Sequence, residues 1–465
     1  MNVKLQIVIE SEPGGLPIIQ EVAQFERAGL QPATLGLALS EAKSILQSVQ
    51  QALVEQQVSG YLAQQAVCQD CGEQRVCKDR RGIVYRSLFG KLNLQGSRLL
   101  HCACQAHSTK SFSPLSELLP ERSSPELLYL ESKFASLMSY GLSVQLLAEL
   151  LPIGASLNAA SVRQNLHQVA LQLEAELGEE QSVFIEGCPD EWAKLPRPEL
   201  PLTVGIDGGY VHSSEQTSRQ DGWFEVIVGK SIPASGNSKV FGFVQTVEQK
   251  PKRRLFEVMQ SQGMQMNQQV TFLSDGGESV RELQLYLNPN AEHLLDWFHI
   301  TMRLTVMQQM SKGLESAQGE LKAGAVAALE HIKWNLWHGK VSRALQWIED
   351  LAVDLDTAET DEKQRKLSKQ VQEFEVYIHR NRAFIVNYGE RYRYGEVISS
   401  AFVESTVNQV VSKRMVKKQQ MRWSKKEAHL LLQIRSKVLN AELQPAFRRW
   451  YAGFAVEEVE PVLAA

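Results

Sequence analysis

Apolar residues recur at helical intervals over three stretches of the chain, residues 37–65, 126–177 and 300–382. In each stretch they return every three to four positions, which places them on one face of an α-helix. Residues 82–94, between the first two stretches, have the pattern of two short strands that turn at Gly90. We therefore expect two helical regions separated by a small hairpin, and a long helical insertion later in the chain.

Short β-rich runs begin after a proline-rich stretch at residues 186–201, which we interpret as a linker. Two of these runs end on an aspartate followed by two glycines, at Asp207 and at Asp275. The expected elements are strands at 202–206, 223–232 and 239–247, a helix at 252–261, a strand at 269–274, a helix at 278–287 and a strand at 292–295, which ends on Asp296. This order of three strands, helix, strand, helix and strand predicts a mixed α/β domain.

The composition is that of a globular protein with more than one domain, since the chain has 465 residues, of which 43% are hydrophobic and 22% charged. No apolar run is long enough to cross a bilayer, and no apolar signal core follows Met1, so we expect a cytoplasmic protein without a membrane segment. The formal net charge is −4, so any contact with nucleic acid must be local. Basic residues gather between Lys413 and Arg449.

Asp207 and Asp275 are the first candidates for chemistry. Each follows a β-rich run, where a side chain can project from the sheet edge while the glycines allow close approach of a substrate. Carboxylates at neighbouring strand ends suit magnesium, which binds through a few carboxylates, waters and phosphate oxygens. The alternative is that Asp-Gly-Gly is an ordinary turn, which fits either copy taken alone.

Glu404 is the candidate for a third carboxylate, which a site with two metal ions normally needs. It opens a helical segment at 403–415, in which Glu404 and Asn408 share one face. The alternative is a solvent-facing glutamate that the helix dipole favours near a helix N-terminus.

Four motifs together resemble the bacterial insertion-sequence transposases of the ISKra family, within the Mutator-like group. They are Gly205-Ile-Asp-Gly-Gly, Leu273-Ser-Asp-Gly-Gly, Asp296-Trp-Phe-His299 and Val403-Glu-Ser-Thr-Val-Asn, and the likeness runs from about Cys68 to Leu439. The resemblance implies a ribonuclease-H-like fold with Asp207, Asp275 and Glu404 as its catalytic triad and a helical insertion before the glutamate. It also implies that Asp296 and His299 form an accessory Asp-x-x-His signature beside the active site. The alternative for His299 is a histidine near a helix start that only packs and hydrogen-bonds.

Paired cysteines suggest a structural zinc site. Cys68-x-x-Cys71 and Cys102-x-Cys104 bracket the expected hairpin, so the two pairs can close on one tetrahedral ion. Such paired cysteines are also part of the family resemblance. Because the second pair has a spacer of one residue, Cys77, His101 or His107 remain alternative ligands, and buried free thiols remain the alternative to a metal site.

Two segments are candidates for DNA contact. Residues 144–151 and 159–173 have the size of a helix-turn-helix, although packing explains them slightly better. The basic segment at 413–426 is the stronger candidate, because sequence-independent affinity for DNA comes from such charges. Its expected contact residues are Lys413, Arg414, Lys417, Lys418, Arg422 and Trp423.

These observations predict an insertion-sequence transposase that binds double-stranded DNA, both terminal inverted repeats and target, and catalyses metal-dependent cleavage and strand transfer with two Mg²⁺ or Mn²⁺ ions. We expect a homo-oligomer on DNA that is nucleoid-associated when bound. The alternatives are a ribonuclease-H-like nuclease or resolvase, and a domesticated, non-catalytic DNA-binding protein.

The expected N-terminal domains are a helical region (1–66), a Cys-rich zinc-ribbon-like module (67–110) and a helical region with the helix-turn-helix candidate (111–185). They are followed by the first part of an α/β ribonuclease-H-like core with a mixed sheet (200–299), a large helical insertion (300–398), and the catalytic helix with the basic C-terminal helices (399–455).

Overall fold

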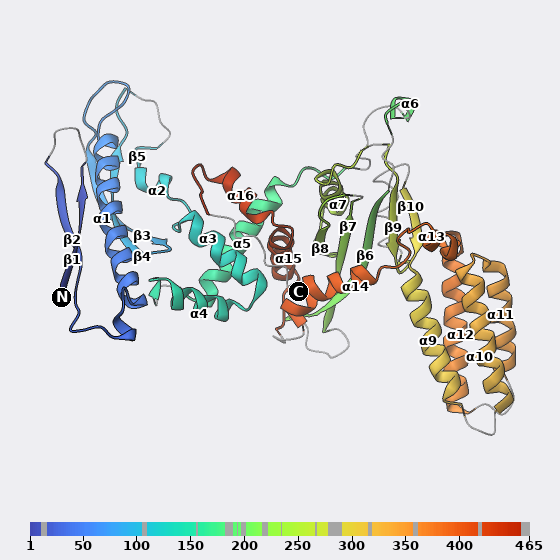
Figure 1. Ribbon diagram of the computed structural model, residues 1–465. Helices are drawn as coiled ribbons and strands as arrows, with labels where there is room; N and C mark the ends of the chain where they lie inside the picture. Colours follow the sequence, from blue (N-terminus) through green and yellow to red (C-terminus); the bar gives the residue numbers. More distant parts are fainter. Residues whose placement is uncertain are drawn as a thin grey trace. The chain divides into compact units, whose positions relative to one another are not determined.

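The computed structural model divides into two units, residues 1–170 with 441–465, and residues 171–440 (Figure 1). The boundary lies inside helix α5 (Ala159–Glu176) and not in the proline-rich stretch where the sequence predicts a linker. Glu174, near the end of α5, is bound to Arg254 of the second unit at 2.7 Å, which is why the last turns of α5 belong to that unit. The structure describes residues 1–10, 16–104, 109–154, 157–181, 189–192, 194–196, 201–215, 222–233, 235–265, 267–277, 291–314, 319–356, 361–416 and 421–456.

The first unit begins with an antiparallel hairpin, β1 (Asn2–Ile9) and β2 (Ile18–Glu26), followed by η1 (Pro32–Thr34) and the long helix α1 (Leu39–Gln65). The helix expected at 37–65 is confirmed, but the description of the whole N-terminal region as helical is wrong. In β1, exposed and half-buried residues alternate, which is the period of a strand with one face against the protein. β2 packs against α1, as Figure 1 shows.

The expected hairpin in the Cys-rich module is confirmed as β3 (Cys77–Ser87) and β4 (Gly90–Leu100), and β5 (Ser111–Phe112) pairs with β4. The chain turns at Gly90, whose φ of 126° favours glycine. Apolar residues of the hairpin pack against α1 and against α2 (Pro114–Leu118). This core contains Ile83, Leu92, Leu94 and Leu115, packed by Val54, Val58 and Leu62.

The rest of the first unit is helical, with α3 (Pro125–Leu137), α4 (Tyr140–Leu150), the first part of α5, and α16 (Leu443–Trp450), which packs on α3. Ser124 and Ser139 cap the N-termini of α3 and α4 by accepting backbone N–H bonds. Between α4 and α5 the chain has the helix-turn-helix size that the sequence suggested, and Arg163 and Gln164 of α5 are exposed. Whether these helices contact DNA stays a prediction.

The second unit is built on a five-stranded mixed sheet in the order β10–β9–β6–β7–β8. The strands are β6 (Leu202–His212), β7 (Trp223–Ile232), β8 (Lys239–Val244), β9 (Val270–Ser274) and β10 (Ala291–Leu295), with α7 (Pro251–Gln260) between β8 and β9 and the short α6 (Pro189–Trp192) before the sheet. β6, β7 and β8 are antiparallel neighbours, whereas β9 and β10 run parallel to β6. The five expected strands and the helix at 252–261 are confirmed; the helix expected at 278–287 lies outside the described residues.

β6 does not end at Asp207, as the sequence analysis expected, but continues to His212. The two glycines after Asp207 stay extended because they pair with β7, Gly208 opposite Ile227 and Gly209 opposite Val226. Glycine here does not make a turn. It leaves room for a helix, since a Cβ on Gly209 would lie 3.1 Å from Val407.

The expected helical insertion is confirmed as four helices, α9 (Trp297–Lys312), α10 (Gly319–Trp337), α11 (Val341–Leu355) and α12 (Glu362–Asn381). Each contacts the next, and α12 contacts α9, which closes a bundle (Figure 1). Its buried apolar core includes Ile300, Leu329, Ile348 and Phe374. No described helix is long and apolar enough to span a membrane.

After the bundle, η4 (Arg382–Phe384) and α13 (Tyr388–Arg393) lead back to the sheet, where α14 (Ala401–Val407) packs on β6 and β7. The helix continues as a π-helix, η5 (Asn408–Val416), and α15 (Lys425–Leu439) covers β8. The helix expected at 403–415 is therefore confirmed, with a change of winding at Asn408.

Candidate active site and metal sites

Three aspartates follow the last parallel pairs of β6, β9 and β10: Asp207 lies within β6, and Asp275 and Asp296 come directly after β9 and β10. β6 and β9 pair up to Gly205 opposite Leu273, two positions before Asp207 and Asp275. β9 and β10 pair in the same direction, and the position after their last pair brings Asp275 beside Asp296. The three acids therefore lie where the parallel pairing of the three strands ends.

The electrostatics of Asp207 reflect this crowding. Burial raises the pKa of Asp207 above its ordinary range, and the charges of Asp275 and Asp296 raise it further. The Gly208 N–H, 2.8 Å from Asp207 Oδ1, and the nearby His299 lower the pKa of the same carboxyl. A cation between the acids would stabilise the charged form that this surrounding disfavours.

Three side chains around Asp275 were missed by the sequence analysis. The Tyr377 hydroxyl donates to the Asp275 carbonyl oxygen at 3.0 Å, and the Arg303 guanidinium lies 4.3 Å from the Tyr377 ring centroid. Burial and then the charge of Asp275 raise the pKa of Glu225, on β7. Arg303 follows His299 by one helical turn, a spacing that could have pointed to it. For Tyr377, which comes from the last helix of the bundle, the sequence offers no such signal.

Asp296 and His299, the expected accessory pair, lie close enough to Asp207 to influence its pKa. Asp296 is fully buried and caps the N-terminus of α9, with the Phe298 N–H 2.9 Å from its Oδ1. His299 Nε2 lies 3.6 Å from Asp296 Oδ2. Both oxygens of Asp296 therefore face protein groups.

Glu404 lies on α14, which crosses the face of β6 that carries Asp207. Gly205, Asp207 and Gly209 alternate onto one face of the strand. A Cβ on Gly205 would overlap Val403, so the helix sits directly over this face. Glu404 is exposed, whereas Asn408, the first residue of the π-helix, is half-buried.

The three carboxylates of the expected triad are not gathered as tightly as the cysteines. In the part of the chain that the structure describes, the cysteine cluster is the one group of three or more His, Cys, Asp or Glu side chains whose ligand atoms all lie within 4.8 Å of one another. Glu404 is exposed on the helix that packs on β6, and the three carboxylates do not close on one point.

The basic segment after Glu404 is partly internal. Arg414 is fully buried with its guanidinium carbon 5.1 Å from the Trp423 ring centroid, and Trp423 is itself 2% exposed. The backbone N–H of Trp423 donates to the His212 carbonyl oxygen at 2.9 Å, which joins this segment to the end of β6. The expectation that Arg414 and Trp423 contact DNA is therefore not supported by their positions, because the pattern of charges does not reveal which arginine turns inward. Lys413 and Arg422 are exposed, and Lys417 and Lys418 lie outside the described residues.

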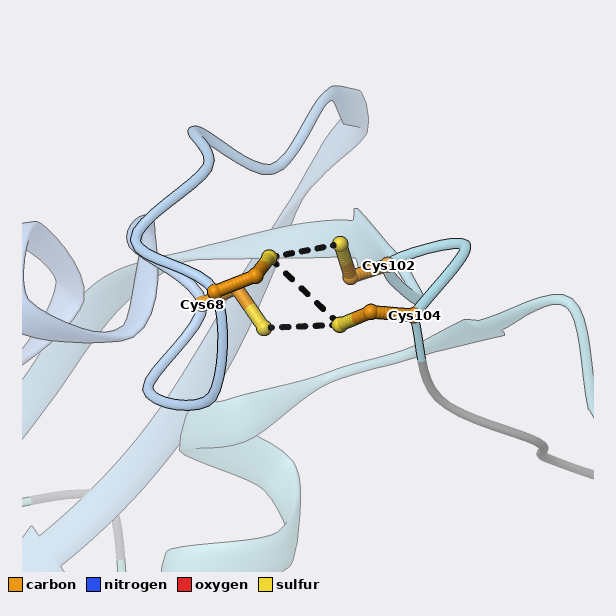
Figure 2. Close-up of side chains that lie close together, drawn as sticks. Cys68, Cys102 and Cys104 are labelled. Atoms are coloured by element: carbon orange, nitrogen blue, oxygen red, sulfur yellow. Dashed lines mark hydrogen bonds between the residues drawn. The ribbon is translucent and has the colours of Figure 1, made fainter.

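Cys68, Cys71, Cys102 and Cys104 form the metal-binding arrangement that the sequence predicted. Their Sγ atoms all lie within 4.8 Å of one another, with 3.6 Å between Cys68 and Cys104 and 3.4 Å between Cys71 and Cys102. Figure 2 shows Cys68, Cys102 and Cys104 pointing toward one another from two loops. The four cysteines are close enough together to bind a metal ion.

The thiols of the cluster differ in how readily they ionise. Backbone N–H groups of Cys71 and Asp70 lower the pKa of Cys68 to about 6, so this thiol is readily ionised. The hydrogen bonds of Cys104 with Cys71 and Cys102 raise the pKa of Cys104. Thiols that share protons in this way offer a cation a set of donors, which suits zinc.

The alternative zinc ligands stand apart from the cluster. The Cys77 thiol donates to the Asp79 carbonyl oxygen at 3.5 Å. The His101 ring stacks on Phe112 with 4.6 Å between centroids. His107 lies outside the described residues.

Comparisons with known proteins give little for this chain. No protein-family model matches it, and no curated protein matches it. Among solved structures it is similar to a chain of the Drosophila P element transposase strand transfer complex, with 8% sequence identity and a TM-score of 0.30, over 69% of this chain and 93% of that chain. So low a TM-score assigns neither fold nor function to this chain.

Proposed function

We propose that the protein is a DNA transposase of the insertion-sequence type, in which Asp207, Asp275 and Glu404 hold two Mg²⁺ or Mn²⁺ ions at a DNA phosphodiester. The observation that carries the proposal is the row of acids in which the charge of Asp275 raises the pKa of Asp207. Mutually repelling carboxylates at a sheet edge are unfavourable by themselves, and a divalent cation removes the repulsion.

The arrangement of the sheet supports a ribonuclease-H-like core for this domain. Three antiparallel strands are followed by two strands parallel to the first, with α7 between the two groups. That is the order that the sequence pattern predicts, apart from the helix expected at 278–287, which lies outside the described residues. The four-helix bundle lies between Asp296 and Glu404, which is where the resemblance implies a helical insertion.

The chemistry that the bound ions would supply is activation of a water or of a 3′-hydroxyl and neutralisation of the phosphate charge. The protein's own residues would hold the ions and orient the DNA. Asp207 and Asp275 would hold the ions from the sheet, and Glu404, on α14, would be the third ligand. Cleavage and strand transfer are both in-line displacements at phosphorus, so one site can serve both by positioning, without a covalent enzyme intermediate.

The cysteine cluster has a separate, structural role in this proposal. A zinc ion held by Cys68, Cys71, Cys102 and Cys104 joins the loop that precedes β3 to the loop that follows β4. The free energy of metal binding then adds to the stability of the hairpin. We also propose that the protein acts as a homo-oligomer on DNA in the cytoplasm, associated with the nucleoid.

A cleavage and joining assay on duplexes that end in the inverted repeats flanking the gene tests the function. We expect Mg²⁺- or Mn²⁺-dependent nicking at the repeat end, followed by joining of the released 3′-hydroxyl to plasmid DNA. Asp207→Asn removes both activities, whereas Asp350→Asn, a change at an exposed aspartate of α11, leaves both intact. Cleavage without joining would favour a nuclease or resolvase, and specific binding without cleavage would favour a domesticated DNA-binding protein.

A further inference from the structure

The Asp296 carboxylate is fully occupied by hydrogen bonds within the protein. Its Oδ1 accepts the Phe298 N–H at 2.9 Å and the Ser400 N–H at 2.8 Å. Its Oδ2 accepts the Ser400 hydroxyl and lies 3.6 Å from His299 Nε2. The side chain is fully buried, so no water competes for these contacts. Asp207 and Asp275, by contrast, are half-buried.

Ser400 is the residue before the helix that carries Glu404. It is the N-cap of α14, and its carbonyl oxygen accepts the Val403 N–H at 2.6 Å and the Glu404 N–H at 3.1 Å. A second tie joins the same two segments, because the Trp297 N–H donates to the Ile398 carbonyl oxygen at 3.2 Å. The end of β10 therefore holds the start of α14 at two points, one helical turn before Glu404.

We propose that Asp296 is a positioning residue and not a metal ligand: by holding Ser400, it fixes α14 so that Glu404 faces Asp207 and Asp275. The inference rests on the proposed function, since it assigns Glu404 the role of third ligand. A buried carboxylate that already accepts three hydrogen bonds has no free oxygen directed at a shared ion. Most helical stability in proteins comes from packing, so the placement of α14, which lies on β6 and β7, depends on such contacts.

The test is a double-mutant cycle on Mn²⁺ affinity and cleavage with the full-length protein, using Asp296→Ala, Glu404→Gln and the double variant. If Asp296 acts through Glu404, the losses of the two single variants are not additive, and the double variant binds Mn²⁺ as Glu404→Gln does. Removal of residues that orient metal ligands typically costs about 10- to 100-fold in affinity or activity, and we expect Asp296→Ala to fall in this range. Additive losses of Mn²⁺ affinity would make Asp296 a ligand in its own right and overturn the proposal. Unchanged affinity and cleavage in Asp296→Ala would overturn it as well.

Two milder variants keep the proposal testable if Asp296→Ala does not fold. Asp296→Asn retains an oxygen for the Phe298 and Ser400 N–H groups and should recover much of the activity, whereas Ser400→Ala removes only the hydroxyl contact. Hydrogen exchange tests the contact between Asp296 and Ser400 independently of cleavage. The amides of Val403 and Glu404 should exchange faster in Ser400→Ala than in the wild type, and equal exchange rates would overturn the proposal. A wild-type protein that binds Mn²⁺ but cleaves no DNA would end the transposase assignment, while the exchange measurement would still decide the role of Asp296.

Discussion

Asp207 and Asp275 lie side by side on parallel strands, and the negative charge of Asp275 raises the pKa of Asp207. Among the described residues, neither aspartate forms an ion pair with a lysine or arginine that would offset this repulsion, whereas Glu292 of the same sheet pairs with Arg391. Acids held together in this way are costly to the fold in the absence of a cation. Asp207 and Asp275 are therefore the residues at which a bound cation would have the largest effect.

We predict that Asp207→Ala, Asp275→Ala and Glu404→Ala each abolish DNA cleavage and leave folding and specific DNA binding intact. Removing either aspartate relieves repulsion, so the protein should be as stable as the wild type or more stable without metal. Mg²⁺ should raise the melting temperature of the wild type and not that of Asp207→Ala, because a ligand that binds only the folded state stabilises it. Calorimetry with and without Mg²⁺ measures both effects. Near-normal cleavage by any one variant would remove that residue from the triad.

The sequence predicted the elements of the second unit well, because strands with buried faces and amphipathic helices leave clear periodic patterns. It placed Asp207 at the end of a strand, since two glycines usually mark a turn. Only the pairing partner across the sheet shows that they extend β6 and leave space for α14. The N-terminal hairpin was missed although the alternation in β1 is visible.

Only those residues of the candidate site that stand in short sequence motifs could be predicted. Asp207, Asp275, Asp296 and Glu404 stand in recognisable local sequences, and so do the four cysteines. Glu225 and Tyr377 come from elements without a motif, so only the tertiary structure brings them to Asp275. The inward turn of Arg414 is likewise set by its contact with Trp423, which depends on the π-helix between Glu404 and that tryptophan.

We predict about one tightly bound zinc per chain, held by the four clustered cysteines. Cys68→Ser and Cys71→Ser should each lose the metal and lower the thermal stability, because binding free energy contributes to folding. Cys77→Ser is the matched control, since this thiol is exposed and donates to the Asp79 carbonyl oxygen. Elemental analysis of protein purified without chelator measures the zinc. A protein that contains none would disprove the site.

A buried glutamate in the first unit predicts a pH-dependent stability. Burial raises the pKa of Glu131 to about 7, against the opposing effects of an Asn165 hydrogen bond at 2.6 Å and of Arg86. The unfolded chain ionises this group near its ordinary pKa of 4.5, so the folded state binds more protons between that value and about 7. The free energy of unfolding therefore falls as the pH rises through this window and stays lower above it.

Glu131→Gln should remove this loss, because glutamine still accepts the Asn165 bond but carries no charge. We expect the variant to be more stable than the wild type at pH 8 by up to about 3 kcal/mol and similar to it at pH 5. Urea unfolding at the two pH values measures the difference, with Glu117→Gln, at an exposed glutamate, as the control. An equal effect of Glu131→Gln at both pH values would contradict the assignment.

Lys413 and Arg422 are exposed basic residues in the segment that follows α14. Arg414 is left out because it is buried, and its removal would disturb the contact with Trp423. Lys413→Gln with Arg422→Gln should weaken binding to every DNA sequence to a similar degree, since phosphate contacts carry no base information. Each lost phosphate contact should lower the slope of log affinity against log salt by about one unit, because fewer counterions are released. Lys363→Gln with Arg343→Gln, at exposed positions of the helical bundle, is the matched control. Loss confined to the terminal-repeat duplex would mean that the pair reads bases. Isotherms for repeat and random duplexes at several salt concentrations separate these outcomes, and a slope equal to that of the control would show that these charges are a solvated helix surface.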